Sequence, residues 1–515
     1  MLFNSYEFIF LFLPLTLLVF YLIGSKVQYR FAIAWLVGAS LFFYSWWNPA
    51  YLVLLLFSIV FNFSLGLVLG HNQNKLMQKL ILVLGIATNI GLLSYFKYFN
   101  FFVENINSLT SNNFNFNEVI LPLAISFFTF QQIAYLVDTF RGETEECDFL
   151  HYCLFVSFFP QLIAGPIVHH KEMMPQFAKT VVHRMQAENF SIGLTIFAIG
   201  LFKKVVIADG IATYATPVFD FAETGGVLTI FEAWGGALAY SFQLYFDFSG
   251  YSDMAIGLAR MFGIRLPQNF NSPYRAKSII DFWGRWHITL SRFLRDYVYI
   301  PIGGNRKGEV RRFTNIFVTM LLGGLWHGAG WTFILWGGLH GAFLVINHIW
   351  RKIFSSKIKT KFGMFFAWLL TILAIVVSWV PFRATSIEGA NNLLIAMFGG
   401  NGISLPARLM GNIGNLEHWL SEHGVTYTSV FYNGVFDLQG VVWVVVLLFI
   451  SVCLPNIQQV MPYDTSGCTK GEPSKLRYHW MKWQPSIAWS IFVAVVLLLS
   501  IMNLSKASEF LYFQF

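Results

Sequence analysis

The sequence predicts an all-α fold that crosses a membrane several times. Of its 515 residues, 56% are hydrophobic and only 12% are charged, whereas soluble globular domains carry about 25% charged residues. Many apolar runs approach the roughly 20 residues that a helix needs to cross the hydrocarbon core. The basic residues gather in short loops between these runs, as in multi-pass membrane proteins. We therefore predict a polytopic integral membrane protein with about 11–12 transmembrane helices.

The apolar runs define the predicted spans in order. They lie near residues 8–24, 31–47, 50–70, 80–100, 119–137, 189–208, 227–247, 331–350, 363–382, 440–455 and 486–503. A shorter run at 314–326 is also expected to cross, because neighbouring helices can shield a short span. The apolar segment 149–168 contains "FFPQLIAGPI", whose prolines interrupt helix geometry. We expect that segment to be broken or re-entrant.

Loop charge predicts the orientation of these spans. Segments 104–118 and 209–226 contain no Lys or Arg, and 385–439 contains only Arg408, so we expect all three on the outer side, with both termini. The cytoplasmic loops are expected to hold Lys26, Arg30, Lys75, Lys79, Lys171 to Arg184, Arg306 to Arg312, Arg351 to Lys361 and Lys470 to Lys482. The net charge of +8 is thus assigned to membrane orientation and not to a nucleic-acid surface, which needs a water-exposed basic face.

No internal repeat is visible, which disfavours the inverted-repeat transporters. We predict one integral membrane domain over residues 1–515, with polar groups concentrated at 243–341 and the largest outward excursion at 385–439. The four cysteines, Cys147, Cys153, Cys453 and Cys468, lack metal-ligand spacing and are interpreted as free packing residues.

Polar residues inside a membrane are costly, so their clustering indicates function. The first cluster is "QLYFDFSGYSDMAIG", residues 243–257, where we expect the helix to break near Ser249 and Gly250. An aspartate at such a break can alternatively cap the next helix. The candidate supporting residues here are Gln243, Asp247, Tyr251 and Asp253.

The second cluster is "DFWGRWHITLSRFLRDYVYI", residues 281–300. At 3.6 residues per turn, one stripe holds Asp281, Arg285, Arg292 and Arg295, and a neighbouring stripe holds Trp283, His287, Ser291 and Leu294. Asp281 and Arg285 are spaced to form an ion pair across one turn. The arginines either rest on anionic lipid from an interfacial helix or border a cytoplasmic pocket for a phosphate-bearing donor. The second interpretation also explains an imidazole on the apolar side.

The third cluster is "LLGGLWHGAGWTFILWGGLHG", residues 321–341. His327 is expected near the outward end of the short span, and His340 lies further along the next helix. The spacing of Gly324, Gly328, Gly337 and Gly341 suits close helix packing. A lone histidine in such an apolar helix is more often a hydrogen-bonded packing residue, but His327 is also a candidate catalytic base, and His340 is a candidate supporting residue.

Other catalytic motifs are absent from the sequence. It has neither a GxxxxGK[ST] phosphate loop nor a GxSxG nucleophile elbow. "GGNRKG" at 303–308 and "HHKE" at 169–172 are interpreted as a turn and a polar loop. His287, His327 and His340 lack the carboxylate partner or HExxH spacing of a zinc site, so we predict no metal and no bound cofactor.

Several long motifs resemble the membrane-bound O-acyltransferase (MBOAT) family, specifically its bacterial alginate O-acetyltransferase (AlgI) type, to which membrane subunits of peptidoglycan O-acetyltransferases are similar. They are "QLYFDFSGYSDMAIGLA", "NFNSPYRAKSIIDFWGRWHITLSRFLRDYVYIPIGGN", "MLLGGLWHGAGWTFILWGGLHG" and "WVPFRA". The resemblance also covers "LFNSYEFIFLFLP", "FFTFQQIAYLVDTFRG", "FFPQLIAGPI", "PNIQQVM" and "FLYFQF", and therefore spans nearly the whole chain.

The resemblance implies an O-acetyltransferase of the bacterial inner membrane. His327, in the "LWHG" motif, would lie at the base of an outward funnel, and His287 on the cytoplasmic side of a thin catalytic layer. The donor would be acetyl-CoA or another phosphopantetheine-linked acetyl group, with its phosphates bound by Arg285, Arg292 and Arg295. His327 would act as general base or carry the acetyl group itself.

The acceptor implied by the resemblance is an exported or cell-wall polysaccharide, of the alginate or peptidoglycan type, reached through a periplasmic acetyltransferase partner. The alternative function is a permease or channel that moves an acetyl carrier or glycan without acyl transfer.

Overall fold

The fold is almost entirely helical. The computed structural model describes residues 1–26, 29–110, 114–144, 148–178, 184–354, 360–406, 414–428, 436–461, 481–505 and 511. Within these ranges, every regular element except one two-stranded sheet is a helix. The predicted all-α class is therefore confirmed.

Six helical segments in the described ranges are long and apolar enough to cross a membrane. They are Phe8–Ser25, Ala50–His71, Lys75–Thr110, Ala187–Glu223, Trp331–Ile353 and Lys361–Arg383. Two shorter apolar helices are Leu438–Cys453 and Ile487–Asn503. The predicted runs 31–47, 119–137 and 314–326 correspond to α2 (Tyr29–Ser45), α6 (Ile125–Phe140) and α15 (Glu309–His327), which do not meet the same limits of length and polarity. The chain is a multi-pass membrane protein.

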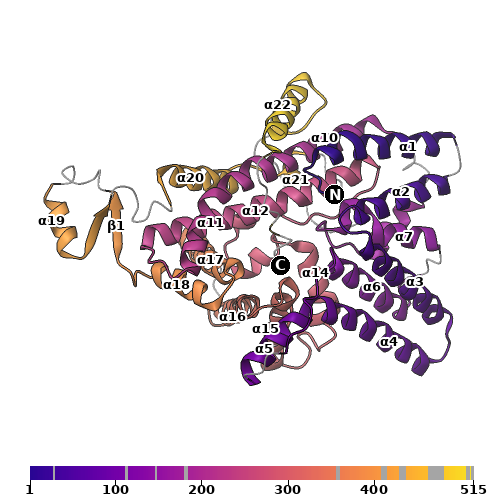
Figure 1. Ribbon diagram of the computed structural model, residues 1–515, viewed down its shortest axis with the longest axis horizontal. Helices are drawn as coiled ribbons and strands as arrows, with labels where there is room; N and C mark the ends of the chain where they lie inside the picture. Colours follow the sequence, from indigo (N-terminus) through magenta and orange to yellow (C-terminus); the bar gives the residue numbers. More distant parts are fainter. Residues whose placement is uncertain are drawn as a thin grey trace.

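The N-terminal helices form one side of the molecule (Figure 1). In chain order they are η1 (Phe8–Phe12), α1 (Leu13–Lys26), α2, α3 (Ala50–His71), α4 (Lys75–Leu93), η2 (Ser94–Tyr98), α5 (Phe99–Thr110), α6, α7 (Phe149–Ser157), α8 (Phe159–Leu162) and α9 (His170–Phe177). The predicted break in 149–168 is confirmed, because α7 ends at Ser157 and Phe158 leaves the helical region at ψ 108°. This side of the molecule forms the first of two hydrophobic clusters.

A long buried helix, α12 (Ile230–Met261), runs through the centre, beside α10 (Ala187–Phe202), η4 (Lys203–Ala208) and α11 (Asp209–Glu223). The predicted break at Ser249 and Gly250 is wrong. A Cβ on Gly250 would lie 2.8 Å from the Gly200 carbonyl oxygen, and one on Gly257 would lie 2.6 Å from that of Gly193. These glycines let α10 and α12 pack with backbones in contact, which offsets the roughly 1 kcal/mol helix cost of each glycine.

The segment 281–300 is not the single helix that its pattern predicted. After η5 (Pro273–Arg275), it forms α13 (Ile279–Trp283), a turn, α14 (Ile288–Leu294) and the π-helical η6 (Arg295–Tyr299). α13 ends at Trp283, and His287 then adopts a left-handed conformation, with φ 42° and ψ 52°, directly before α14. The predicted pair is confirmed, since Arg285 Nε lies 2.7 Å from Asp281 Oδ1. The predicted turn at 303–308 is also present.

Two helices carry the third cluster, α15 and α16 (Trp331–Ile353), and α17 (Lys361–Arg383) follows them. The predicted glycine packing is confirmed. A Cβ on Gly324 would lie 2.3 Å from the Phe333 carbonyl oxygen, and one on Gly337 would lie 2.5 Å from that of Met320. α16 and α17 join α11 and the first half of α12 in the second hydrophobic cluster.

The remaining elements include the predicted excursion. They are α18 (Ile387–Met397), β1 (Ile403–Pro406), α19 (Asn415–Glu422), β2 (Val425–Thr428), α20 (Leu438–Cys453), α21 (Ile457–Val460) and α22 (Ile487–Asn503). β1 and β2 pair in parallel, with Ile403 opposite Val425. Figure 1 shows α19 and β1 projecting from one end of the helical body, and α22 standing out from its upper margin.

Candidate active site

His287 has a buried ring whose orientation is fixed by one amide. Its Nδ1 lies 3.1 Å from Asn269 Oδ1, which also accepts a hydrogen bond from Thr289 Oγ1 at 2.9 Å. An amide oxygen only accepts, so Nδ1 carries the proton and Nε2 presents its lone pair. Among the described residues, Nε2 has no hydrogen-bond partner. The buried His287 ring therefore has an Nε2 lone pair that no described residue uses.

His327 is the last residue of α15 and stands among aromatic rings. Its ring centroid lies 4.9 Å from that of Trp326, 5.1 Å from Trp336 and 5.2 Å from Phe382, at angles of 70–86°. Only 8% of the residue is exposed. These walls restrict the rotamer of the imidazole and keep bulk water away from it.

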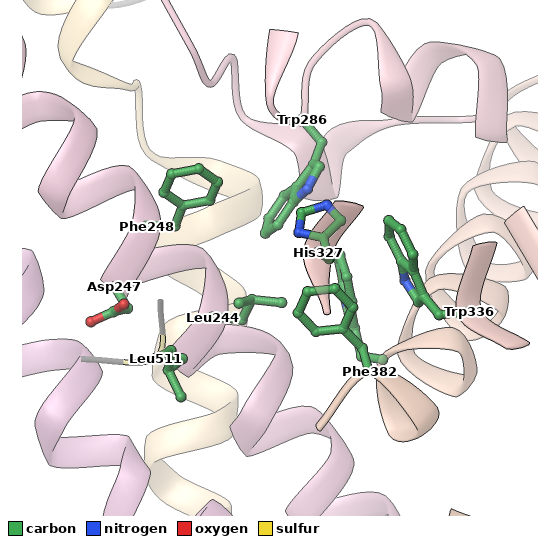
Figure 2. Close-up of a pocket in the computed structure, with 9 residues that line it drawn as sticks. Leu244, Asp247, Phe248, Trp286, His327, Trp336, Phe382 and Leu511 are labelled. Carbon is green, nitrogen blue, oxygen red and sulfur yellow. The ribbon is translucent and has the colours of Figure 1, made fainter. Parts of the chain in front are cut away.

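The two imidazole rings lie close together, with centroids 6.4 Å apart. A cavity of about 20 Å³ adjoins His327 and is lined by Leu244, Asp247, Phe248, Trp286, His327, Trp336, Trp379, Phe382 and Leu511. This is room for about one water molecule. Figure 2 shows the His327 ring between Trp286 and Trp336, with Asp247 and Leu511 on the opposite side of the cavity from Trp336. Residues from five separate stretches of the sequence therefore meet at His327.

Lys97 supports His327 through the backbone, and the sequence interpretation missed it. From η2, its Nζ donates to the carbonyl oxygens of Trp326 at 2.5 Å and His327 at 3.1 Å. The last carbonyls of a helix have no partner within the helix, and a cation at that end is favourable. A lysine inside the apolar run 80–100 was the signal that could have revealed it.

His340 has a different role, because both of its ring nitrogens have partners. Its Nδ1 accepts from Trp283 Nε1 at 3.2 Å, and its Nε2 lies 3.0 Å from Ser378 Oγ. It is fully buried and does not line the cavity at His327. His340 joins α13, α16 and α17, as in the packing alternative.

The carboxylates of α12 are paired with two lysines that the sequence interpretation missed, Lys204, which is buried, and Lys203, which is half-buried. Lys204 Nζ lies 2.7 Å from both Asp247 Oδ1 and Asp209 Oδ1, and Lys203 Nζ lies 2.7 Å from Asp253 Oδ2. Both lysines lie on the π-helical η4, and such widened turns are frequent at functional sites. The alternative that Asp247 caps the next helix is therefore wrong. Asp247 instead forms a buried ion pair with Lys204 at the edge of the cavity.

Gln243 and Tyr251 are buried on the same helix. The Tyr251 ring stacks on Phe3, with centroids 4.7 Å apart. Neither residue lines the cavity at His327. They pack α12 within the core.

The three arginines that were expected to bind a donor all have acidic neighbours. Besides Arg285, Arg292 makes two contacts with Glu172, of 2.5 and 2.9 Å, and Arg295 Nε contacts Asp296 Oδ1 at 2.7 Å. Ser291, between them, donates to the Trp286 carbonyl oxygen at 3.5 Å. The structure thus places these arginines on α14 and its flanks, next to His287.

The predicted polar loop at 169–172 is wrong, because α9 begins at His170. The helix forms here since Glu172 reaches back to the His169 backbone nitrogen and pairs with Arg292. Burial, and next the positive charge of Arg292, lower the pKa of His169 to about 4. Burial lowers the pKa of His170 to about 4 as well.

The cysteines that the structure describes, Cys153 and Cys453, are free; Cys147 and Cys468 lie outside the described residues. Likewise, in the described ranges no group of three His, Cys, Asp or Glu residues is placed to hold a metal ion.

Comparison with known proteins gives the family. The MBOAT, membrane-bound O-acyltransferase, profile matches residues 41–388, which is more than half of the chain. The chain belongs to the MBOAT family. It is therefore an acyltransferase, and the predicted family and enzyme class are confirmed.

Two of the relatives found are named for acetylation, and a third is named for D-alanyl transfer. A peptidoglycan O-acetyltransferase of Helicobacter pylori is 45% identical over 88% of this chain and 90% of its own length. A probable alginate O-acetylase AlgI of Pseudomonas aeruginosa is 42% identical over 77% and 75%. A teichoic acid D-alanyltransferase of Bacillus subtilis is 31% identical over 51% of this chain and 67% of its own length.

Proposed function

We propose that this MBOAT protein is an O-acetyltransferase of a bacterial inner membrane. It takes acetyl from a cytoplasmic thioester, acetyl-CoA or a phosphopantetheine-linked carrier, and passes it to a hydroxyl on the outer side. The observation that carries the proposal is the pair of buried imidazoles, His287 and His327, with centroids 6.4 Å apart. The names of the relatives support polysaccharide acetylation, of the peptidoglycan or alginate type, completed by a periplasmic acetyltransferase partner.

The chemistry needs one base and a dry site. The acceptor oxygen attacks the thioester carbonyl, its proton passes to His327, the carbon–sulfur bond breaks, and the thiolate leaves and takes up a proton. His287, whose Nε2 has an available lone pair, is close enough to orient the thioester end of the donor or share that proton. The aromatic walls exclude water, which would otherwise compete with the acceptor as nucleophile.

The test uses protein reconstituted in liposomes. With acetyl-CoA labelled in its acetyl group outside, and with the periplasmic acetyltransferase partner and either de-O-acetylated alginate or peptidoglycan fragments inside, the wild type labels one polysaccharide. His327→Ala is expected to insert normally and to lose this labelling by at least about 10³-fold. His71→Ala, which removes an exposed histidine of α3, is the matched control and should retain activity.

Two results would overturn the proposal. Full acetylation by His327→Ala would remove the catalytic assignment. Label found inside the vesicles and still attached to coenzyme A would show the permease alternative, because a permease moves the donor without breaking the thioester.

A further inference from the structure

A second and larger cavity lies on the other side of α12. Its volume is about 410 Å³, and its walls include Ile199 of α10, Phe246 of α12, Ile450 of α20 and Phe492 of α22. At 100° per residue, Phe246 points away from Leu244, Asp247 and Phe248, which line the His327 cavity, and the two cavities share no lining residue. The second cavity is therefore separate from the candidate active site.

This cavity is bordered by two helices that face the lipid. α20 packs on α12, and α22 packs on α10, but the described residues of α20 and α22 make no substantial contact with each other. Both lie on one margin of the molecule in Figure 1. Their outer faces are apolar and exposed, with Phe449 59% and Leu498 59% exposed. In a bilayer, exposed apolar faces of this kind meet acyl chains.

A few polar groups lie among the apolar walls. The Ser451 hydroxyl is buried, with 6% of the residue exposed, and has no hydrogen-bond partner among the described residues. Asn456 Nδ2 donates to Ser272 Oγ at 3.0 Å, and Lys203 pairs with Asp253 at the opposite wall. An unpaired buried hydroxyl costs about 1–3 kcal/mol. The hydroxyl of Ser451 is thus a buried donor in this wall that a ligand oxygen would satisfy.

The volume indicates the kind of occupant. Pockets for small ligands measure about 300–1,000 Å³ and combine apolar walls with a few polar groups. A helix about 10 Å across would use roughly the whole volume for a single turn, so the cavity does not admit a partner helix. An extended hydrocarbon chain entering from the bilayer does fit.

We propose that this cavity holds one acyl chain of a membrane phospholipid, inserted between α20 and α22, with Ser451 donating to its ester carbonyl. Burial of the acyl chain against the apolar walls stabilises the complex. The ester carbonyl accepts a hydrogen bond from the Ser451 hydroxyl, which otherwise has no partner among the described residues. The site is independent of the thioester chemistry at His327.

Native mass spectrometry of the full-length protein in dioleoyl-phosphatidylglycerol nanodiscs tests the proposal. The wild type should retain one phospholipid at collision energies that strip all others. Ser451→Ala should reduce the retained fraction several-fold and Ser451→Phe, which fills the cavity, about tenfold or more. Val445→Phe, on the exposed face of α20, is the matched control and should retain the lipid.

A second measurement keeps the proposal testable if Ser451→Phe fails to fold. The wild type is photolabelled in vesicles with a phosphatidylglycerol carrying a diazirine in one acyl chain, and digested. Labels on Ser451, Leu454 or Trp489, which line the cavity, are the expected result. Labels confined to outer residues such as Phe449 and Leu498, or equal lipid retention by the wild type and Ser451→Phe, would overturn the proposal.

Discussion

The tautomer of His287 that leaves the Nε2 lone pair available is fixed by Asn269, a residue that no sequence motif indicates. Asn269 lies in a loop, and only the folded backbone brings its amide to the imidazole. The left-handed backbone at His287 costs about 1–2 kcal/mol, which α14 and the Asn269 contacts offset. The sequence predicts His287 and His327 as candidate catalytic residues but not the tautomer of His287.

At the same scale, Lys97 is a positioning residue for His327. We expect Lys97→Met to lower kcat by about 10–100-fold, because a displacement of about 1 Å of a reacting group costs about 10²-fold. Donor KM should change little, and Lys97→Arg, which keeps the cation at the end of α15, should recover part of kcat. Steady-state acetylation measures all three.

Its control is Lys75→Met, which removes an exposed lysine from α4 and should leave kcat unchanged. If Lys97→Met alters only protein yield and leaves kcat intact, the lysine is merely structural.

His169 and His170 predict an acid-dependent stability. Each has a pKa of about 4 in the folded protein against an ordinary value of 6.5. The unfolded chain therefore binds protons first, and stability falls as the pH drops from 6.5 towards 4. The melting temperature measured across this range should fall less steeply in a His169→Gln, His170→Gln double variant than in the wild type. Parallel curves would contradict the prediction.

At the scale of elements, the contact between α10 and α12 rests on glycine backbones. We expect Gly257→Ala to destabilise the protein by about 1–3 kcal/mol, because its new methyl group would meet the Gly193 carbonyl oxygen. Gly91→Ala, where a Cβ meets nothing within 4 Å, is the matched control and should be neutral or slightly stabilising. Thermal unfolding in detergent measures both, and equal melting temperatures would argue against the packing account.

Some helix boundaries could be predicted from the local sequence, and others could not. The break in 149–168 and the pair of glycine-containing helices α15 and α16 follow from local composition, because proline and glycine act on their own backbone. The continuation of α12 past Gly250 does not, since the stabilising contact comes from Gly200, far away in the sequence. Lys203 and Lys204 escaped notice for a similar reason: their acidic partners lie on other helices.

At the scale of the molecule, Arg292 and Glu172 connect α9 of the N-terminal side to α14 at the site. Their side chains are only 16% and 10% exposed, so removing one partner leaves a largely buried charge. We expect Arg292→Gln to destabilise the protein by about 3 kcal/mol, and the double variant with Glu172→Gln to recover much of that loss. A double-mutant cycle of melting temperatures tests the coupling between Arg292 and Glu172. If the double variant loses the sum of the two single losses, the residues are not coupled.

Arg295, with its side chain 61% exposed, is freer to meet a donor. We expect Arg295→Gln to raise KM for the acetyl donor several-fold and to leave KM for the polysaccharide unchanged, because a guanidinium binds phosphate with two hydrogen bonds. An unchanged donor KM would favour the lipid-anchoring interpretation of this segment.

The aromatic enclosure of His327 also bears on what happens when no acceptor is present. With space for about one water molecule and few polar groups to hold it, the chamber gives a stray nucleophile little opportunity to reach a bound thioester. An idle enzyme would therefore leave its donor intact. On the proposed function, the protein could therefore hold its thioester donor through intervals without an acceptor, with little loss of acetyl groups to hydrolysis.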